Sequence, residues 1–527
     1  MKKLYFGGTI LTMDQELYAE AVLTENDKIL AIGNKEVLAE AASGAECIDL
    51  DGTTLMPGFI DAHSHYSQVA AGLLQVSLNE LDSTTTIRDR ISEFVKKNGI
   101  SPGDWIIASD FDQNNMPGGK YLLLSQLDEL APQNPLILRH KSGHSGLFNS
   151  QALKKLGVTE SSVAPEGGKI EKKERHLTGL MEENAFFHYL EKVPTPEPEK
   201  MLSMYEQAQE QYASNGITTI QEGMFVKQMA PLYEMILKKE ILKLDLVAYS
   251  EVKSIELLET VFPTHINKYN GHFKIGGLKI FLDGSPQGKT AWMSNPYSGE
   301  TSYCGYGTMS DEDVCNAILS AAKLKLQLIA HCNGDAACEQ LIRCMECCKM
   351  KLPSIQNMRT VIIHAQFLQK NQIKRAAELG IIASFFVAHV WYWGDTHIKN
   401  LGFERASRMS PAASALSNGL LFTFHQDAPV IQPNMLETIW SAVCRRTKSG
   451  VDLKEEKISV LEALKAVTVN GAFQYFEEDK KGTISPGKKA DFVILDRNPL
   501  EVPLEELRKI VVLQTIKDGK CIFRRNL

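Results

Sequence analysis

A pair of histidines at the end of an apolar segment is the strongest chemical signal in this sequence. Residues 57–65 read PGFIDAHSH, so an apolar strand candidate ends in His63 and His65. Alternate side chains of a β-strand point to the same face, which places both imidazoles on one side. Two imidazoles on one side can bind a single metal ion. His-x-His is weak evidence alone, but the preceding Pro-Gly turn and apolar strand make it more specific.

Three more candidate ligands lie at the ends of other apolar runs. His331, His364 and Asp427 each lie at or just beyond the carboxyl end of a strand candidate. Any one of them could be a hydrogen-bonded structural residue. Together they indicate a shared site, because barrel enzymes keep their active sites at the carboxyl ends of the strands.

Lys279 opens the apolar run KIFLDG at residues 279–284. A lysine in a buried strand is costly unless its charge is paired or chemically altered. One interpretation is an ion pair with Asp283 or another carboxylate. The other is reaction of the neutral amine with carbon dioxide, which gives a carbamate whose oxygens can bridge two divalent ions. The sequence leaves both interpretations open.

These residues need strands whose carboxyl ends meet. Strand-like segments alternate with helical segments such as 201–215, 311–324 and 371–379, which is the pattern of a parallel sheet with crossover helices. Eight such units close a (β/α)8 TIM-like barrel, an α/β fold. The strand candidates are residues 55–63, 217–222, 242–251, 273–281, 326–330, 360–363, 381–387 and 420–424.

The rest of the chain predicts two additions to the barrel, which would itself occupy residues 56–480. The gap after the first strand candidate is too long for one helix, so an inserted subdomain is expected at about 68–200. Residues 1–55 and 481–527 contain short strand-like runs separated by turn residues. They predict one small β-sandwich-like domain built from both termini.

The composition excludes several classes of protein. The chain has 527 residues, of which 44% are hydrophobic and 23% charged, which excludes a disordered, collagen-like or coiled-coil chain. The net charge of −7 and the lack of a long basic run predict no nucleic-acid partner. Without a run of 18 apolar residues, no membrane partner is expected. Five of the ten cysteines lie close together at Cys332, Cys338, Cys344, Cys347 and Cys348, and they are interpreted as reduced thiols packed on a helix of a cytoplasmic protein.

These motifs resemble the amidohydrolase superfamily, specifically amidohydrolase family 3. That group includes N-substituted formamide deformylases and many uncharacterised metal-dependent hydrolases. The resemblance covers essentially the whole chain. It is carried by PGFIDAHSH (57–65), RHKSGHSGLFNS (139–150), KIFLDGSPQGKT (279–290), HCNGD (331–335), IHAQ (363–366), HQDAPV (425–430) and GTISPGKKADFVIL (482–495).

The resemblance implies a role for each candidate ligand. His63 and His65 would bind the more buried metal ion, and His331 and His364 a second ion. Lys279, once carboxylated, would bridge the two. Asp427 would ligate the buried ion, accept a proton from the attacking water and later act as an acid to the leaving amine. Imidazole and carboxylate ligands suit zinc without excluding other divalent metals, and one or two ions per chain both remain open.

Four residues are candidate substrate contacts. His144 lies in a Gly- and Ser-rich loop that the resemblance places over the barrel mouth. His389 and Trp391 follow the seventh strand candidate in an aromatic segment, which predicts either a pocket wall or a packed loop. Asp283 is a weaker candidate for a contact with substrate or with a metal ligand.

The predicted function is metal-dependent hydrolysis of a carbon–nitrogen bond in a small molecule, such as an N-substituted formamide or an N-acyl amine. The alternative enzyme is a mononuclear deaminase of a cyclic amidine, which needs His-x-His, one further His and an Asp but not Lys279. A non-catalytic binding module is disfavoured because none of the expected ligands is missing. A homodimer is expected, since two-fold assemblies are the commonest.

Overall fold

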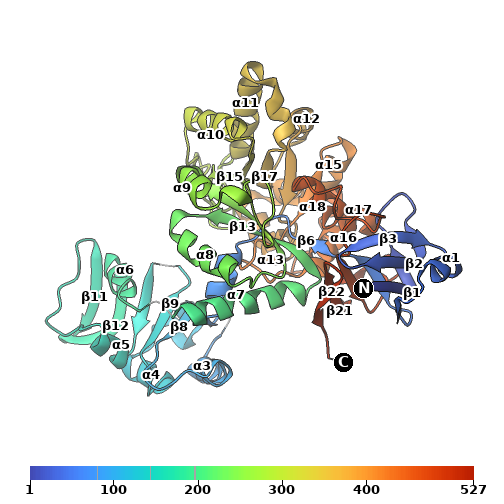
Figure 1. Ribbon diagram of the computed structural model, residues 1–527. Helices are drawn as coiled ribbons and strands as arrows, with labels where there is room; N and C mark the ends of the chain where they lie inside the picture. The colour runs from blue at the N-terminus through green and yellow to red at the C-terminus, as the bar shows by residue number, and fades with distance from the viewer. Residues whose placement is uncertain (80, 143, 195–196, 527) are drawn as a thin grey trace. The chain divides into compact units, whose positions relative to one another are not determined.

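The computed structural model describes residues 1–79, 81–142, 144–194 and 197–526 (Figure 1). The chain forms two compact units: Met1–Ser67 together with Ala208–Leu527, and Gln68–Gln207. The second unit is therefore an insertion between two parts of the first. None of the described helices is long and apolar enough to cross a membrane.

An eight-stranded parallel sheet forms the centre of the first unit. Its middle strands are buried at almost every residue, as expected of a parallel sheet that is covered on both faces. This is the predicted α/β TIM-like barrel. In sheet order its strands are β6 (Phe59–Ile60), β13 (Ile217–Phe225), β14 (Asp245–Glu251), β15 (Phe273–Phe281), β16 (Gln327–Cys332), β17 (Val361–His364), β18 (Ile382–Phe385) and β19 (Phe422–Phe424).

Amphipathic helices alternate with these strands. In α10 (Asp311–Lys323) the buried residues Val314, Ala317, Ile318 and Ala321 follow the i, i+3, i+4, i+7 spacing of one helix face, and the Ser310 side chain caps the first turn. The other helices of this part are α8 (Ala230–Lys238), α9 (Ile255–Val261), α11 (Asp335–Lys351), α12 (Lys370–Glu378), α13 (His389–Leu401), α14 (Phe403–Ser407), α15 (Ala412–Ser417), α16 (Met435–Cys444), α17 (Val460–Ala466) and α18 (Val469–Gln474). Helix α7 (Pro198–Ala213) begins in the second unit and ends in the first.

The first predicted strand, residues 55–63, is wrong as a single strand. The structure divides it into β5 (Thr54–Pro57), which belongs to another sheet, and β6 in the barrel. The change of sheet occurs at Gly58, where an added Cβ would lie 2.4 Å from the Thr218 side chain. A continuous apolar run did not reveal the division, because both strands are buried.

The segments that follow the first and last barrel strands meet at the mouth of the barrel. The Asp427 N–H donates to the His63 carbonyl (3.3 Å), and the His65 N–H donates to the Ala428 carbonyl (2.8 Å). These backbone contacts bring the His-x-His segment beside Asp427, although the two segments are far apart in the sequence.

A second sheet in the same unit combines both ends of the chain. Its core includes Tyr5, Val22, Leu55 and Phe492. Strands come from both termini, but the compact unit that contains this sheet also contains the barrel. The strands are β1 (Lys2–Leu11), β2 (Tyr18–Glu25), β3 (Lys28–Gly33), β4 (Glu46–Asp49), β5, β20 (Phe492–Leu495), β21 (Val512–Lys517) and β22 (Lys520–Arg524), with helix α1 (Lys35–Ala41) between β3 and β4.

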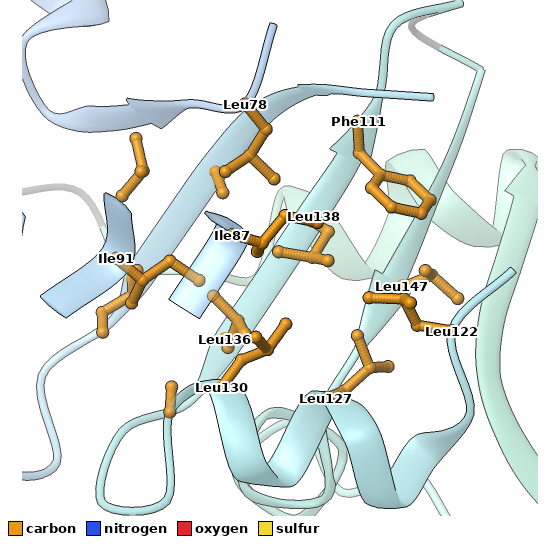
Figure 2. Close-up of a cluster of buried hydrophobic side chains, with 14 of the residues drawn as sticks. Leu78, Ile87, Ile91, Phe111, Leu122, Leu127, Leu130, Leu136, Leu138 and Leu147 are labelled. Carbon is orange, nitrogen blue, oxygen red and sulfur yellow. The ribbon is translucent and has the colours of Figure 1, made fainter. Parts of the chain in front are cut away.

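The inserted unit has a six-stranded sheet and a hydrophobic core of its own. Figure 2 shows part of that core, in which Leu78, Ile87, Phe111, Leu127 and Leu138 are among the labelled side chains. The elements are β7 (Gln75–Ser77), α3 (Thr84–Asn98), β8 (Ile106–Phe111), α4 (Leu124–Leu130), β9 (Leu136–His140), β10 (Ser145–Phe148), α5 (Ser150–Lys155), β11 (Gly168–Lys173), β12 (His176–Glu183) and α6 (Asn184–Leu190); α2 (Tyr66–Gly72) begins in the first unit.

Candidate metal centre

Histidines from separate strands surround the Asp427 carboxylate. Its Oδ1 lies 3.5 Å from the Nε2 of His63 and 3.3 Å from the Nε2 of His65. Its Oδ2 lies 3.8 Å from the Nε2 of His364. His63 and His65 follow β6, His364 ends β17, and Asp427 follows β19. The carboxyl ends of these strands therefore place four predicted ligands in one cluster.

His331 and Lys279 extend this cluster. The ring centroids of His331 and His364 are 4.6 Å apart. Lys279 lies in β15 with its Nζ buried and without a hydrogen-bond partner. Burial, followed by the positive charge of Lys279, holds the pKa of His63 well below its usual range. The predicted ion pair between Lys279 and Asp283 is not formed.

The donor set fits a divalent metal ion. Donor atoms of His63, His65 and Asp427 all lie within 4.8 Å of one another, and the Asp427 Oδ1 is a buried acceptor without a hydrogen bond. Burial lowers the pKa of His364 well below its usual range, so this imidazole is neutral and can act as a ligand. Neutral imidazoles beside a carboxylate are ligands typical of zinc.

The electrostatics of the cluster keep Asp427 ionised and make the Lys279 amine more readily neutral. Burial alone would raise the pKa of Asp427, but the imidazoles beside it, first that of His65, hold it well below its usual range. Burial lowers the pKa of Lys279 to about 8, against the opposing effect of Asp427. The cluster thus combines an ionised carboxylate with a lysine whose neutral form is more accessible than that of an exposed lysine.

Gln221 orients His63, and our sequence analysis missed it. Its Oε1 lies 2.5 Å from the Nδ1 of His63, while its Nε2 donates to the Ala62 carbonyl and the Tyr475 hydroxyl, both at 2.9 Å. The amide is thereby fixed with Oε1 as acceptor. His63 must donate through Nδ1, and its Nε2 keeps a free lone pair. The sequence did contain a signal for this role, because Gln221 is a polar residue within the strand candidate 217–222.

His425 supports His364 in a similar way and was also missed. The Nε2 of His425 lies 3.3 Å from the Nδ1 of His364, and its Nδ1 lies 2.8 Å from the Ser384 hydroxyl. If His364 donates through Nδ1, its Nε2 lone pair is left facing Asp427. The motif HQDAPV contains His425, but its spacing from Asp427 gave no indication of this contact.

Asp283 is buried and contacts His331, a candidate metal ligand. Its carboxylate accepts hydrogen bonds from the backbone N–H groups of Trp292 (3.0 Å), Asn333 (2.9 Å) and Gly334 (2.7 Å), and it lies 3.2 Å from the Nδ1 of His331. Its side chain is fully buried. Of the two predicted contacts for Asp283, the structure shows one with His331, a candidate metal ligand, and its contact with substrate stays a prediction.

One side of the cluster is open. The side chains of His65, His331 and Asp427 are 14%, 15% and 13% exposed, whereas those of His63 and His364 are 1% and 5% exposed. Water and substrate can therefore reach the cluster on the side of His65, His331 and Asp427.

The aromatic segment after the seventh barrel strand is helical and not a loop, because residues 389–401 form α13. His389 is buried against Phe386 and Trp393, each at 4.5 Å between ring centroids, and its Nδ1 lies 3.0 Å from the Nε2 of His397. Phe386 also packs against His364, so His389 adjoins the wall of the cluster.

The predicted roles of Trp391 and His144 in substrate binding stay predictions. The ring of Trp391 packs against Trp440, with centroids 5.1 Å apart, and against Arg508. His144 belongs to the inserted unit, where it is exposed and its Nδ1 lies 3.1 Å from the Glu183 carboxylate. The contacts of both residues are with neighbours outside the metal cluster.

Comparison with known proteins agrees with this geometry. A sequence model of the amidohydrolase family matches residues 46–523. This chain belongs to the amidohydrolase family. As a member of that family, the protein is a hydrolytic enzyme that acts on carbon–nitrogen bonds.

Members similar over their whole length include two curated proteins. The N-substituted formamide deformylase of Arthrobacter pascens is 27% identical, covering 96% of this chain and 95% of the relative. Protein LONG AFTER FAR-RED 3 of Arabidopsis thaliana is 29% identical, covering 99% and 91%. An uncharacterized metal-dependent hydrolase from Pyrococcus horikoshii OT3 shares the fold with a TM-score of 0.78 and 24% identity, covering 96% and 99%. This amidohydrolase thus matches its relatives over essentially its full length.

Proposed function

We propose that this amidohydrolase cleaves the amide-type bond of a small N-substituted formamide or N-acyl amine with water activated at a divalent metal centre. The convergence of His63, His65, His331 and His364 around Asp427 carries this proposal. The similarity to an N-substituted formamide deformylase supports the substrate class.

His63, His65 and Asp427 would hold one ion, and His331 and His364 a second one. A bound divalent ion of the zinc class lowers the pKa of water from about 15.7 to about 7 and polarises a carbonyl group. Asp427 is ionised and partly exposed, so its carboxylate accepts the proton of the attacking water and passes it to the departing amine nitrogen. His389, beside Phe386, would border the bound substrate.

Carboxylation of Lys279 would complete a two-ion centre. The lone pair of the neutral amine attacks the carbon of carbon dioxide, and the nitrogen loses one proton, which leaves a carbamate anion. The pKa of about 8 makes a neutral amine accessible near physiological pH. The free Nζ and the absence of a carboxylate paired with it, among the residues that the structure describes, support this modification.

A mononuclear deaminase of a cyclic amidine is the second candidate. Among the described residues, His63, His65 and Asp427 are the one group of at least three potential ligands whose donor atoms all lie within 4.8 Å of one another. That trio could hold a single ion. A region of 100 residues is also 32% identical to guanine deaminase of Escherichia coli (strain K12), although this covers 17% of the chain.

Metal content and turnover together test the proposal. Protein purified without chelators is expected to contain about two zinc-class ions per chain by plasma mass spectrometry. It should hydrolyse members of a panel of N-substituted formamides and N-acyl amines, lose activity when the metal is chelated, and recover when the metal is restored. About one ion per chain, with turnover of cyclic amidines only, would favour the deaminase.

Asp427→Asn tests the proton transfer. This variant should lose turnover by a factor of about 10² to 10⁴, the usual contribution of a general acid–base group, with its circular dichroism unchanged. Asp452→Asn is a matched control, because it removes a peripheral ion pair with Lys457. Near-normal turnover in Asp427→Asn would contradict the proposed role of Asp427 in proton transfer.

A further inference from the structure

A cavity separate from the metal cluster lies toward the amino ends of the barrel strands. Its volume is about 620 Å³, within the range of small-molecule sites. It is lined by the early residues of β14, β15 and β16, by the segment before β15 and by the segment after α18. Lys274 lines this cavity and Lys279 lies in the metal cluster five positions along the same strand, so the two sites are separated by about 16 Å of extended chain.

The charge of this cavity is positive. Lys268, Lys325 and Lys480 line it, and among the described residues none of them forms an ion pair with a carboxylate. The acidic residue in the described lining is Glu477, and it is already paired with Lys274 and Lys481. Three exposed lysines without carboxylate partners therefore border one cavity, which favours an anionic ligand.

The walls of the cavity are aromatic. The rings of Tyr249, Tyr269 and Tyr475 line it. The hydroxyls of two of them are used within the protein, because Tyr249 donates to the Gln327 side chain and Tyr475 donates to the Asp61 carbonyl. Tyr249 and Tyr475 are 1% and 2% exposed, so the aromatic surface open to a ligand is that of the partly exposed Tyr269 and of the exposed Phe476, which also lines the cavity. Such surface suits a flat apolar group.

We propose that this cavity is a binding site for a small aromatic anion. The aromatic body packs against the rings of Tyr269 and Phe476, and the anionic group lies among Lys268, Lys325 and Lys480. The site is separate from the metal centre. It does not depend on which substrate the metal centre hydrolyses.

Naphthalene-2-sulfonate is the probe, because a sulfonate is a poor metal ligand and the probe carries both required features. Calorimetric titration of the full-length protein should show one site, at least tenfold weaker binding of the neutral naphthalene-2-sulfonamide, and loss of affinity with added salt. Asp427→Asn should bind the probe as the parent does, which distinguishes this cavity from the metal centre.

Two variants test whether the probe binds in this cavity. Lys268→Glu/Lys325→Glu/Lys480→Glu should weaken binding at least tenfold, whereas Lys173→Glu/Lys253→Glu/Lys520→Glu, which changes three exposed lysines elsewhere, should not. Ser354→Trp places a large ring at the exposed cavity rim without changing charge and should also weaken binding, with Ser302→Trp as its control. Equal affinities for sulfonate and sulfonamide, or unchanged binding in both cavity variants, would overturn the proposal.

Discussion

One histidine of the metal cluster has its ring nitrogens assigned by a neighbouring side chain. The Gln221 amide accepts from the Nδ1 of His63, which leaves the Nε2 lone pair for a metal, and His425 contacts the Nδ1 of His364. Residues that orient ligands in this way typically contribute 10- to 100-fold to metal affinity.

We expect Gln221→Leu to weaken metal binding by about 10- to 100-fold, because His63 then loses the acceptor that selects its tautomer. Competition with a chromophoric chelator measures this directly and needs no substrate. Gln340→Leu is the control, since Gln340 is also buried but its amide donates to Met309 and Asp311. Equal metal affinities of Gln221→Leu and the parent would contradict the assigned role.

Lys279→Met should leave the metal-free protein at least as stable as the parent. The Nζ is buried without a partner, so its removal relieves a desolvation penalty while the side chain keeps its length. The same variant should bind fewer ions per chain if a carbamate bridges two of them. Urea unfolding of the metal-free protein and metal analysis of the loaded protein measure the two effects.

Lys274→Met is the matched control in the same strand. It breaks a buried ion pair with Glu477 and should destabilise the protein by about 3–5 kcal/mol. A comparable loss of stability in Lys279→Met would show that the Lys279 amine has a partner after all.

At the scale of elements, one carboxylate connects the barrel to the terminal sheet. Asp245 begins β14, and its Oδ2 lies 2.5 Å from the Nζ of Lys481 and 3.0 Å from that of Lys517 in β21. Its Oδ1 also lies 2.8 Å from the Nδ1 of His272. Asp245, Lys481 and Lys517 are buried, so removal of Asp245 leaves two buried cations with less compensation.

We expect Asp245→Asn to lower the free energy of unfolding by about 3–5 kcal/mol at pH 7. Asp311→Asn, which breaks an exposed pair with Arg343, should cost less than about 1 kcal/mol. Chemical denaturation of both variants measures the difference. Similar small effects would mean that Asp245 does not hold the two sheets together.

The same carboxylate predicts an acid dependence of stability. Burial alone would raise the pKa of Asp245, but Lys481 and Lys517 hold it well below its usual range. As the pH falls, the Asp245 carboxylate is protonated first in the unfolded chain, near pH 4. Its contribution to stability is therefore complete above that pH and decreases as the pH falls below it. Chemical denaturation between pH 7 and pH 3 should show that the free energy of unfolding falls less steeply with decreasing pH in Asp245→Asn than in the parent.

At the scale of the whole molecule, the candidate ligands all belong to one compact unit. His63, His65 and the ligands from Lys279 onward lie in the first unit, while the inserted unit has its own core. Units with separate cores can unfold separately.

Leu138→Ala, in the core of the inserted unit, should therefore destabilise that unit by about 2–5 kcal/mol without changing the metal content per chain. Ile329→Ala, in the barrel core, should lower the stability of the metal-binding unit instead. Calorimetry with parallel metal analysis compares the two variants. Loss of metal in Leu138→Ala below its unfolding transition would contradict the independence of the units.

Much of the barrel could be predicted from patterns along the chain. The candidate at residues 273–281 coincides with β15, and the remaining candidates beyond residue 200 overlap the observed strands closely. Buried parallel strands are apolar throughout, so their positions are visible in the sequence. The division at Gly58 and the helix α13 were not visible, because each depends on which partner the segment packs against.

By itself, the sequence determined which residue types could bind a metal and at which strand ends they lie. Side-chain chemistry and the alternation of strands with helices are local properties of the chain. Only the tertiary structure decided which other side chains contact and orient these candidate ligands. Gln221 meets His63 across 158 positions, and Asp283 meets His331 while Lys279 stays unpaired. These contacts arise when neighbouring strands bring distant segments into hydrogen-bonding distance, and no local pattern encodes that approach.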